Sequence, residues 1–307
     1  MTRLVLRLQG PGATGTRVHG RLLRSALDVL VDTVEQSVRL RAEGRSQARG
    51  SKPSWLERAS AFTVAIRPGS TVLDLEAPPL AQLVPDRFAQ TEMFEPIEPD
   101  QSCLDVFAGA LRSALEGERD SDLFDDTLIG TLLGLGDLFE HGVQSVEVEN
   151  GARLHVDRSN LEKLRELRRA MPPDQRVRVA GTLDALRHSS RTFELRLEDG
   201  EVVRGILAGE AGEIAEFGSQ LGSQVLVEGT AKFRASGRVL RIDADSLAST
   251  EATAGLWTGA PRPVFSPLGR AELRYPQGPR SGLAAIIGQW PGDETDEEIE
   301  VALRDLS

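Results

Sequence analysis

The residue types that most often carry catalysis or metal binding are present in this chain, but their spacing forms no recognised site. The four histidines, His19, His141, His155 and His188, are scattered, with neither an HExxH pattern nor a Cys/His cluster for zinc. The single cysteine, Cys103, begins an apolar helical pattern, where we expect a small core residue rather than a nucleophile. We therefore predict no metal site, no cofactor and no enzymatic activity.

Two further segments superficially match ligand-binding loops. Residues 10–17, GPGATGTR, have the glycines of a phosphate-binding loop but place Thr16 and Arg17 where that loop needs lysine and a hydroxyl group. The acidic run at residues 120–126 places Asp125 where a calcium loop of the EF-hand type needs glycine. We interpret the first segment as a turn between a strand and a helix. We interpret the second as a helix cap with solvated acids.

Composition excludes several classes of protein. The 307 residues are 40% hydrophobic and 27% charged, which is typical of a globular chain of about two domains. The net charge of −11 disfavours extended binding to duplex DNA, because an acidic surface repels phosphates. We find neither a signal peptide nor an apolar run long enough to cross a membrane. With only one cysteine, the chain is expected to be a cytoplasmic protein.

The most readable stretch is residues 176–247, where apolar and polar residues alternate as in half-buried strands. Turns are expected at Asp199-Gly200 and Ser236-Gly237, since these pairs tolerate tight hairpins. The pattern predicts strands at 176–183, 193–197, 203–207, 225–233 and 240–244, with a short helix at 214–221. Three strands, a helix and two strands resemble the five-stranded Greek-key barrel of the OB fold, which hosts many functions.

The residues before this barrel alternate between helical and strand patterns. Strands or hairpins are expected at 4–8, 62–75 and 146–156, and helices at 23–38, 104–115, 128–139 and 161–167. We expect an exposed loop at residues 44–53 and an irregular crossing at 77–99. The expected fold class is α+β: a mixed α/β N-terminal domain, an OB-like barrel and a C-terminal helical tail.

Prolines and composition place the expected domain boundaries. Pro172-Pro173 stops the last helix of the first domain, which we assign to residues 1–173. The barrel domain is assigned to residues 174–250. Residues 251–280 are rich in Ala, Gly, Pro and Ser and are interpreted as a linker, followed by an acidic amphipathic tail at 281–307.

The tail contains the signals of a short capped helix. Thr295 and Glu298 have the spacing of a capping box, in which each side chain satisfies an orphan amide. Ile299, Leu303 and Leu306 then follow at i, i+4 and i+7 and form a narrow apolar stripe. A helix this short is marginal alone in water, so it either docks on its own chain, stays solvated, or folds on a partner.

Residues 293–307 hold seven acidic residues and one arginine, a net charge of −6. If the tail binds a protein partner, we expect aromatic and aliphatic anchors flanked by carboxylates. The residues expected to contact that partner are Ile286, Ile287, Trp290, Asp293, Glu294, Glu298, Ile299 and Leu303.

The sequence GQWPGDETDEEIEVAL in this tail resembles the C-terminal segments of bacterial proteins encoded beside PIN-domain ribonuclease toxins. Those segments typically carry a G-x-W/x-G-D/E-E-S/T-D-E-E pattern and act as antitoxin peptides. The resemblance covers the tail only. It implies a non-catalytic protein whose tail inhibits a PIN-type ribonuclease.

Two alternatives remain open. OB barrels often bind single-stranded nucleic acid, and Lys232, Arg234, Arg238 and Arg241 form a possible nucleic-acid face on the last two strands. Against this, the barrel's phenylalanines, Phe193, Phe217 and Phe233, alternate inward, and acids on neighbouring strands favour a solvated mixed-charge surface. The second alternative is a structural or interaction scaffold. The oligomeric state does not follow from the sequence.

Overall fold

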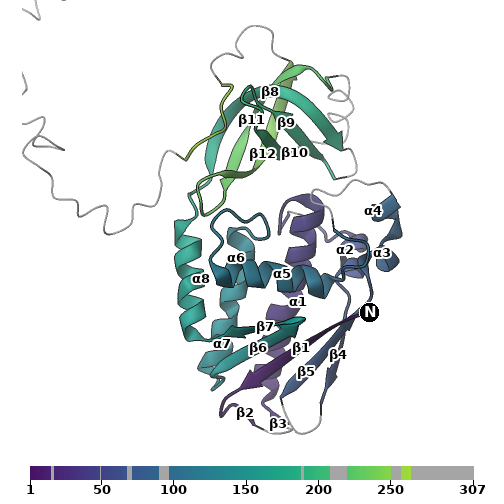
Figure 1. The fold of residues 1–307 in the computed structure, drawn as a ribbon, viewed down its shortest axis with the longest axis vertical. Coiled ribbons are helices and arrows are strands. Elements are labelled where there is room, and N and C mark those ends of the chain that lie inside the picture. Colours follow the sequence, from purple (N-terminus) through teal and green to yellow (C-terminus); the bar gives the residue numbers. More distant parts are fainter. Residues whose placement is uncertain are drawn as a thin grey trace, which may run out of the picture. The chain divides into compact units, whose positions relative to one another are not determined.

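The computed structural model describes residues 1–14, 17–48, 50–67, 71–89, 97–187, 190–207, 220–249 and 257–263. Nearly all of the expected helix at 214–221 lies outside these described residues, and so does the whole tail. The chain before the barrel is an α+β fold, as expected (Figure 1). Its strands are β1 (Thr2–Gln9), β2 (Ala13–Thr14), β3 (Arg17–Val18), β4 (Thr63–Ile66), β5 (Val72–Ala77), β6 (Ser145–Asn150) and β7 (Ala152–Val156).

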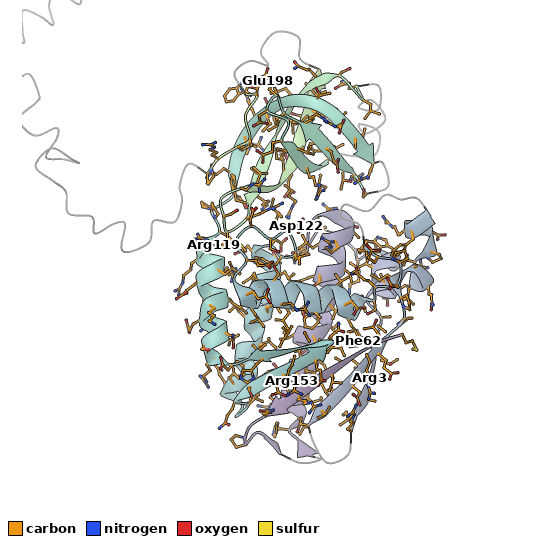
Figure 2. The ribbon with its side chains drawn as sticks, viewed as in Figure 1. Arg3, Phe62, Arg119, Asp122, Arg153 and Glu198 are labelled. Carbon is orange, nitrogen blue, oxygen red and sulfur yellow. The ribbon has the colours of Figure 1, made fainter. Side chains whose placement is uncertain are left out.

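Five of these strands form one antiparallel sheet in the order β4-β5-β1-β6-β7. Its inner face continues the alternation of the sequence: Leu4, Leu6 and Leu8 of β1 are buried, and Leu73 and Leu75 of β5 lie opposite the first two. The outer face carries charged side chains, including Arg3 and Arg153 (Figure 2). One buried face and one polar face is the usual arrangement of an antiparallel sheet.

The helices cover the inner face of this sheet (Figure 1). They are α1 (Gly20–Glu43), α2 (Ser54–Ala59), α3 (Leu80–Leu83), α4 (Pro85–Ala89), α5 (Cys103–Glu116), α6 (Asp126–Leu132), the 3-10 turn η1 (Leu133–Leu135), α7 (Gly136–Glu140) and α8 (Arg158–Ala170). α5 begins with a capping box between Ser102 and Asp105 and ends at Gly117, which adopts a left-handed conformation.

Two local expectations were wrong. The crossing at residues 77–99 contains the short helices α3 and α4, and prolines start both, since Pro79 precedes α3 and Pro85 is the first residue of α4. Proline at a helix start loses no hydrogen bond, so these prolines begin helices rather than prevent them. In the segment at residues 10–17, where a plain turn was expected, β2 and β3 form a small two-stranded ribbon.

The second fold unit is a closed five-stranded barrel, as the alternation predicted. It comprises β8 (Gln175–Arg187), β9 (Thr192–Arg196), β10 (Val202–Leu207), β11 (Gln224–Phe233) and β12 (Val239–Ser249), in the closed order β10-β12-β11-β8-β9. The third strand runs parallel to the fifth, and all other neighbours are antiparallel. The strand order and the closure match the OB-like barrel expected from the sequence.

The barrel has its own hydrophobic core, separate from that under the sheet. Phe193 is the largest side chain that is almost fully buried there, and it lies opposite Gly205 on the neighbouring strand. A β-carbon added to Gly205 would lie 2.1 Å from the Cζ atom of Phe193 and 2.8 Å from the carbonyl oxygen of Ile242. Glycine at this position therefore makes room for the aromatic ring across the barrel interior.

Residues 257–263, within the expected linker, lie against the barrel. The amide of Ala180 on β8 donates a hydrogen bond of 2.9 Å to the carbonyl oxygen of Trp257. Ala260 packs against the barrel core, and Pro263 approaches the turn at Gly237. This short segment thus follows the barrel wall from β8 to the turn between β11 and β12.

We predict that Gly205→Ala destabilises the protein by about 1–3 kcal/mol, because the added methyl group overpacks the ring of Phe193. Gly109→Ala in α5 is the matched control, since a β-carbon there meets nothing within 4 Å. The control should raise stability by up to about 1 kcal/mol through helix propensity. Urea unfolding of both variants measures the difference, and equal effects would contradict the close packing of the barrel.

Candidate functional site

The four cationic residues expected to form a nucleic-acid face lie where the barrel meets the α+β fold. Each is paired with a carboxylate of its own chain. Lys232 pairs with Asp174, Arg234 and Arg238 pair with Asp120, and Arg241 pairs with Asp125 and Asp243. Arg241 has a side chain that is only 8% exposed. The interpretation of these residues as a solvated surface was therefore wrong for Arg241, because the α+β fold covers it.

We call the turn between β11 and β12, residues 234–238, the clamp loop. It contacts the segment between α5 and α6. Its Ser236 donates backbone and side-chain hydrogen bonds, both of 2.8 Å, to the Arg119 carbonyl and the Asp120 carboxylate. The guanidinium of Arg119, labelled in Figure 2, donates back to the carbonyl of Ala235. Ala235 itself is 2% exposed and belongs to the core under the sheet. The barrel thus contributes one residue to the other core.

A second contact beside the clamp loop centres on Asp125. This residue caps α6 by accepting a hydrogen bond of 3.0 Å from the amide of Leu128. It also accepts from the hydroxyl of Ser46 at 2.6 Å and pairs with Arg241 at 3.4 Å. A buried carboxylate is tolerated when its partners replace the lost water, and here three elements supply them.

Sequence reasoning found part of this site and missed its connections. The cap of α6 at residues 125 or 126 was expected, and Asp125 is the cap. The acids of this run are not simply solvated, however, since Asp125 is 8% exposed and Asp120 binds the clamp loop. Residues 44–53 are not uniformly exposed either, because Ser46 is buried against Asp125. No spacing signal links these segments, since about 80 residues or more separate the partners.

A cavity of about 350 Å³ lies beside this contact. It is lined by residues 125–127, by the chain crossing at 171–174, and by Lys232, Phe233, Leu240 and Arg241. Each charged group of its lining already has a partner in the chain: Arg241 pairs with Asp125, Lys232 with Asp174, and Asp126 with Arg168. The cavity is therefore bordered by carboxylates and cations in roughly equal number, which suits neither a strongly anionic nor a strongly cationic ligand.

The outer face of β9 and β10 is the surface that OB barrels commonly use for ligands. The described side chains of this face that reach solvent carry no aromatic ring: Glu194, Arg196, Val202 and Arg204. Thr192 and Ile206, at the end of the same face, are buried. Glu194 lies within 4 Å of the guanidinium groups of both Arg187 and Arg204. Phe193 and Phe233 point inward as expected, and Phe217 lies outside the described residues. Stacking with bases has no platform on this described face.

Among the described residues of the barrel and of the segment after it, the most exposed aromatic side chain belongs to that segment. Trp257 is 41% exposed and lines a groove of about 660 Å³ beside β8 and β11. Arg176, Arg178 and Arg262 line the same groove, and the first two pair with Asp245 and Glu228. The sequence analysis placed Trp257 in the linker and missed this groove, because Trp257 reaches the barrel only through the fold.

Residues with potential for catalysis are spread through the described fold. Burial raises the pKa of Cys103 to about 12, so its thiol stays protonated at neutral pH. His141 contacts the carbonyl of Asp137, and His155 lies 3.7 Å from Asp157. Among the described residues there is no group of three or more His, Cys, Asp or Glu side chains that could hold a metal ion.

The expected partner-binding residues of the tail, from Ile286 to Leu303, lie outside the described residues. Comparisons with models of protein families, with curated proteins and with solved structures found no match. Within the described part of the chain, no helix has the length and apolar character needed to cross a membrane.

We predict that Asp125→Ala lowers the free energy of unfolding by about 3 kcal/mol, because it removes a helix cap and leaves Arg241 buried with one acidic partner fewer. Asp126→Ala is the matched control. Its carboxylate is 59% exposed and pairs with Arg168 at the surface, so its loss should cost under about 1 kcal/mol. Urea denaturation followed by circular dichroism distinguishes the two, and similar midpoints would contradict the buried pair.

A pH dependence follows from Asp120. Burial acts to raise the pKa of this carboxyl, but hydrogen bonds from Ser236 and Arg238 and the charges of Arg234 and Arg238 outweigh burial, so the pKa lies below the ordinary 3.8. A lowered folded-state pKa means that the carboxylate stabilises the contact above about pH 3.8, and that this stabilisation is lost as the pH falls through the folded value.

Hydrogen exchange at the amide of Ser236 reports on this contact, because that amide donates to Arg119. Its protection factor should fall as the pH drops below about 3.8, and in Asp120→Asn it should be low at every pH. Protection that is equal in both proteins across this range would show that Asp120 does not hold the clamp loop.

Proposed function

We propose that this chain is a non-catalytic protein-binding protein that acts through its C-terminal tail as an antitoxin-like inhibitor of a PIN-type ribonuclease. The observation that carries the proposal is the tail sequence, where Trp290 precedes a capping box, an apolar stripe and a net charge of −6. The folded part of the chain would then carry and present the tail.

The geometry of the barrel supports a protein partner over a nucleic acid. All four cations of the expected nucleic-acid face already bind carboxylates of the chain itself. Contact with phosphates would require breaking those pairs, and for Arg241 it would require exposing a buried residue. The clamp loop, which corresponds to a common ligand-binding loop of OB barrels, is occupied by the segment between α5 and α6.

The inhibition we propose is occlusion. PIN nucleases hold divalent metal in a cluster of acidic residues at the floor of a cleft that binds RNA. The apolar anchors of the tail, Trp290, Ile299 and Leu303, would bury themselves near the rim of that cleft. Carboxylates such as Asp293, Glu294 and Glu298 would pair with the basic residues that otherwise hold RNA phosphates.

The test uses the full chain, a chain ending at Arg280, and a purified PIN-domain ribonuclease encoded in the same genome. We expect the full chain to bind the nuclease and suppress RNA cleavage, and the shortened chain to do neither. Trp290→Ala and Leu303→Ala should each weaken binding by about 2 kcal/mol, roughly thirtyfold, as expected for buried anchors.

Val301→Ala is the matched control for the anchors, since residue 301 lies off the stripe of Ile299, Leu303 and Leu306. It should leave binding nearly unchanged. The melting temperature of the body should be the same in all variants. A fall of several degrees in Trp290→Ala or Leu303→Ala would instead make the tail a structural strap of the chain, and the proposal would fail.

One observation favours a second candidate, a protein that binds single-stranded nucleic acid. Trp257 offers an exposed ring beside Arg176, Arg178 and Arg262, and rings flanked by cations are typical of such sites. This candidate predicts that a labelled oligonucleotide binds with an affinity that falls steeply with salt and is lost in Trp257→Ala. Arg234→Ala should not change it, because Arg234 lies at the contact with the α+β fold.

A further inference from the structure

The outer edge of β4 presents backbone groups that no described strand pairs with. β4 is the terminal strand of its sheet and is hydrogen-bonded there to β5 alone. The amide of Arg67 donates to the carbonyl of Val72, which makes this a hydrogen-bonded pair. Such pairs alternate along an antiparallel ladder, so Thr63 and Ala65 direct their backbone groups to β5. Val64 and Ile66 therefore direct theirs away from the sheet.

The side chains of the same two residues extend rows that are buried elsewhere in the sheet. One row runs across the inner face from Leu4 through Leu75 to Val64. Leu4 and Leu75 are both 0% exposed, whereas Val64 is 39% exposed. Ile66 ends the neighbouring row and is 53% exposed. Two hydrophobic rows thus stop at the edge without being covered.

The opposite edge of the sheet differs in character. β7 carries Arg153 and His155, whose side chains are 62% and 52% exposed. Charged groups on an edge strand oppose pairing with another strand, and proteins use them for that purpose. β4 has β-branched residues, which favour strand pairing, at three of its four positions. Only the β7 edge is therefore protected by charge.

We propose that the edge of β4 pairs with β4 of a second copy of this chain, so that two sheets join into one antiparallel sheet around a two-fold axis. With the axis at Ala65, Val64 lies opposite the partner's Ile66, and four outward backbone hydrogen bonds form. Ala65 then meets the partner's Ala65 as a non-hydrogen-bonded pair, where its small side chain avoids crowding.

This register joins both faces of the two sheets. On the inner face, the row that ends at Val64 continues into the partner's Ile66 and then into the buried row beside that residue. The side chains of Val64 and Ile66 are thereby removed from water. On the outer face, the partner's Arg67 lies beside Thr63, and the next residue across is Glu76. The guanidinium of Arg67 donates to Asp74 of its own chain, so this row keeps its existing ion pair and places no like charges opposite each other.

A second copy fits this edge better than an unrelated peptide for a geometric reason. An antiparallel pair of identical strands satisfies its own hydrogen bonds and places each exposed Val64 against an exposed Ile66, so one surface supplies both halves. The pairing involves only five residues, 63–67, on each side. We therefore expect a weak dimer that dissociates on dilution. This inference is independent of the tail and of its partner.

Disulfide trapping of the full-length chain tests the register. Ala65→Cys places two thiols at a non-hydrogen-bonded pair, where Cα atoms lie about 4.5 Å apart and a disulfide can close. Thr63→Cys is the matched control, because four residues of offset separate its two copies by roughly 13 Å along the strands. The native Cys103 is fully buried and does not compete. Mild oxidation should yield a disulfide-linked dimer of Ala65→Cys only.

A second measurement separates pairing from random collision. Val64→Lys combined with Ile66→Lys charges the edge without changing the groups that face β5. In the Ala65→Cys background this change should abolish the cross-link, and in the native chain it should abolish concentration-dependent dimerisation in sedimentation equilibrium. Equal cross-linking of Ala65→Cys and Thr63→Cys, cross-linking that survives the lysines, or a native chain that stays monomeric at all concentrations would overturn the proposal.

Discussion

Arg241 and Asp125 are both withdrawn from water, and they pair with each other at 3.4 Å. The pair could not persist alone, because the desolvation of two ions is offset only when further hydrogen bonds complete their shells. Ser46, the amide of Leu128 and Asp243 supply those bonds. This buried pair therefore connects the loop after α1, the start of α6 and the last barrel strand. The clamp loop docks beside it.

Local patterns were sufficient for the fold but not for this contact. The alternation in Leu4–Leu8 and in the barrel strands predicted both sheets, since period and turn chemistry act over a few residues. A cap at Asp125 or Asp126 was expected for the same reason, and Asp125 is the cap. That it also binds Arg241, 116 residues away, depends on how two fold units meet, and no local pattern encodes this. Trp257 was missed for the same physical reason.

The arrangement separates two roles within one chain. Three of the cations that could have served an external ligand, Arg234, Arg238 and Arg241, instead bind carboxylates of the α+β fold. Lys232 binds Asp174 at the start of the barrel. The barrel therefore resembles the OB fold in topology while its clamp loop serves an internal contact. The surfaces that we propose for partners are the edge of β4, the groove of Trp257 and the tail.

The burial of Ala235 in the core under the sheet has a consequence for anyone who dissects this chain. A barrel expressed alone would expose that methyl group together with Arg234, Arg238 and Arg241, which would lose their partners Asp120 and Asp125. Lys232 would keep Asp174, and Arg241 would keep Asp243. Such a fragment would bind polyanions, including nucleic acids, through arginine charges that are paired with carboxylates in the intact chain. Affinity for DNA or RNA measured on that fragment would be an artefact of excision.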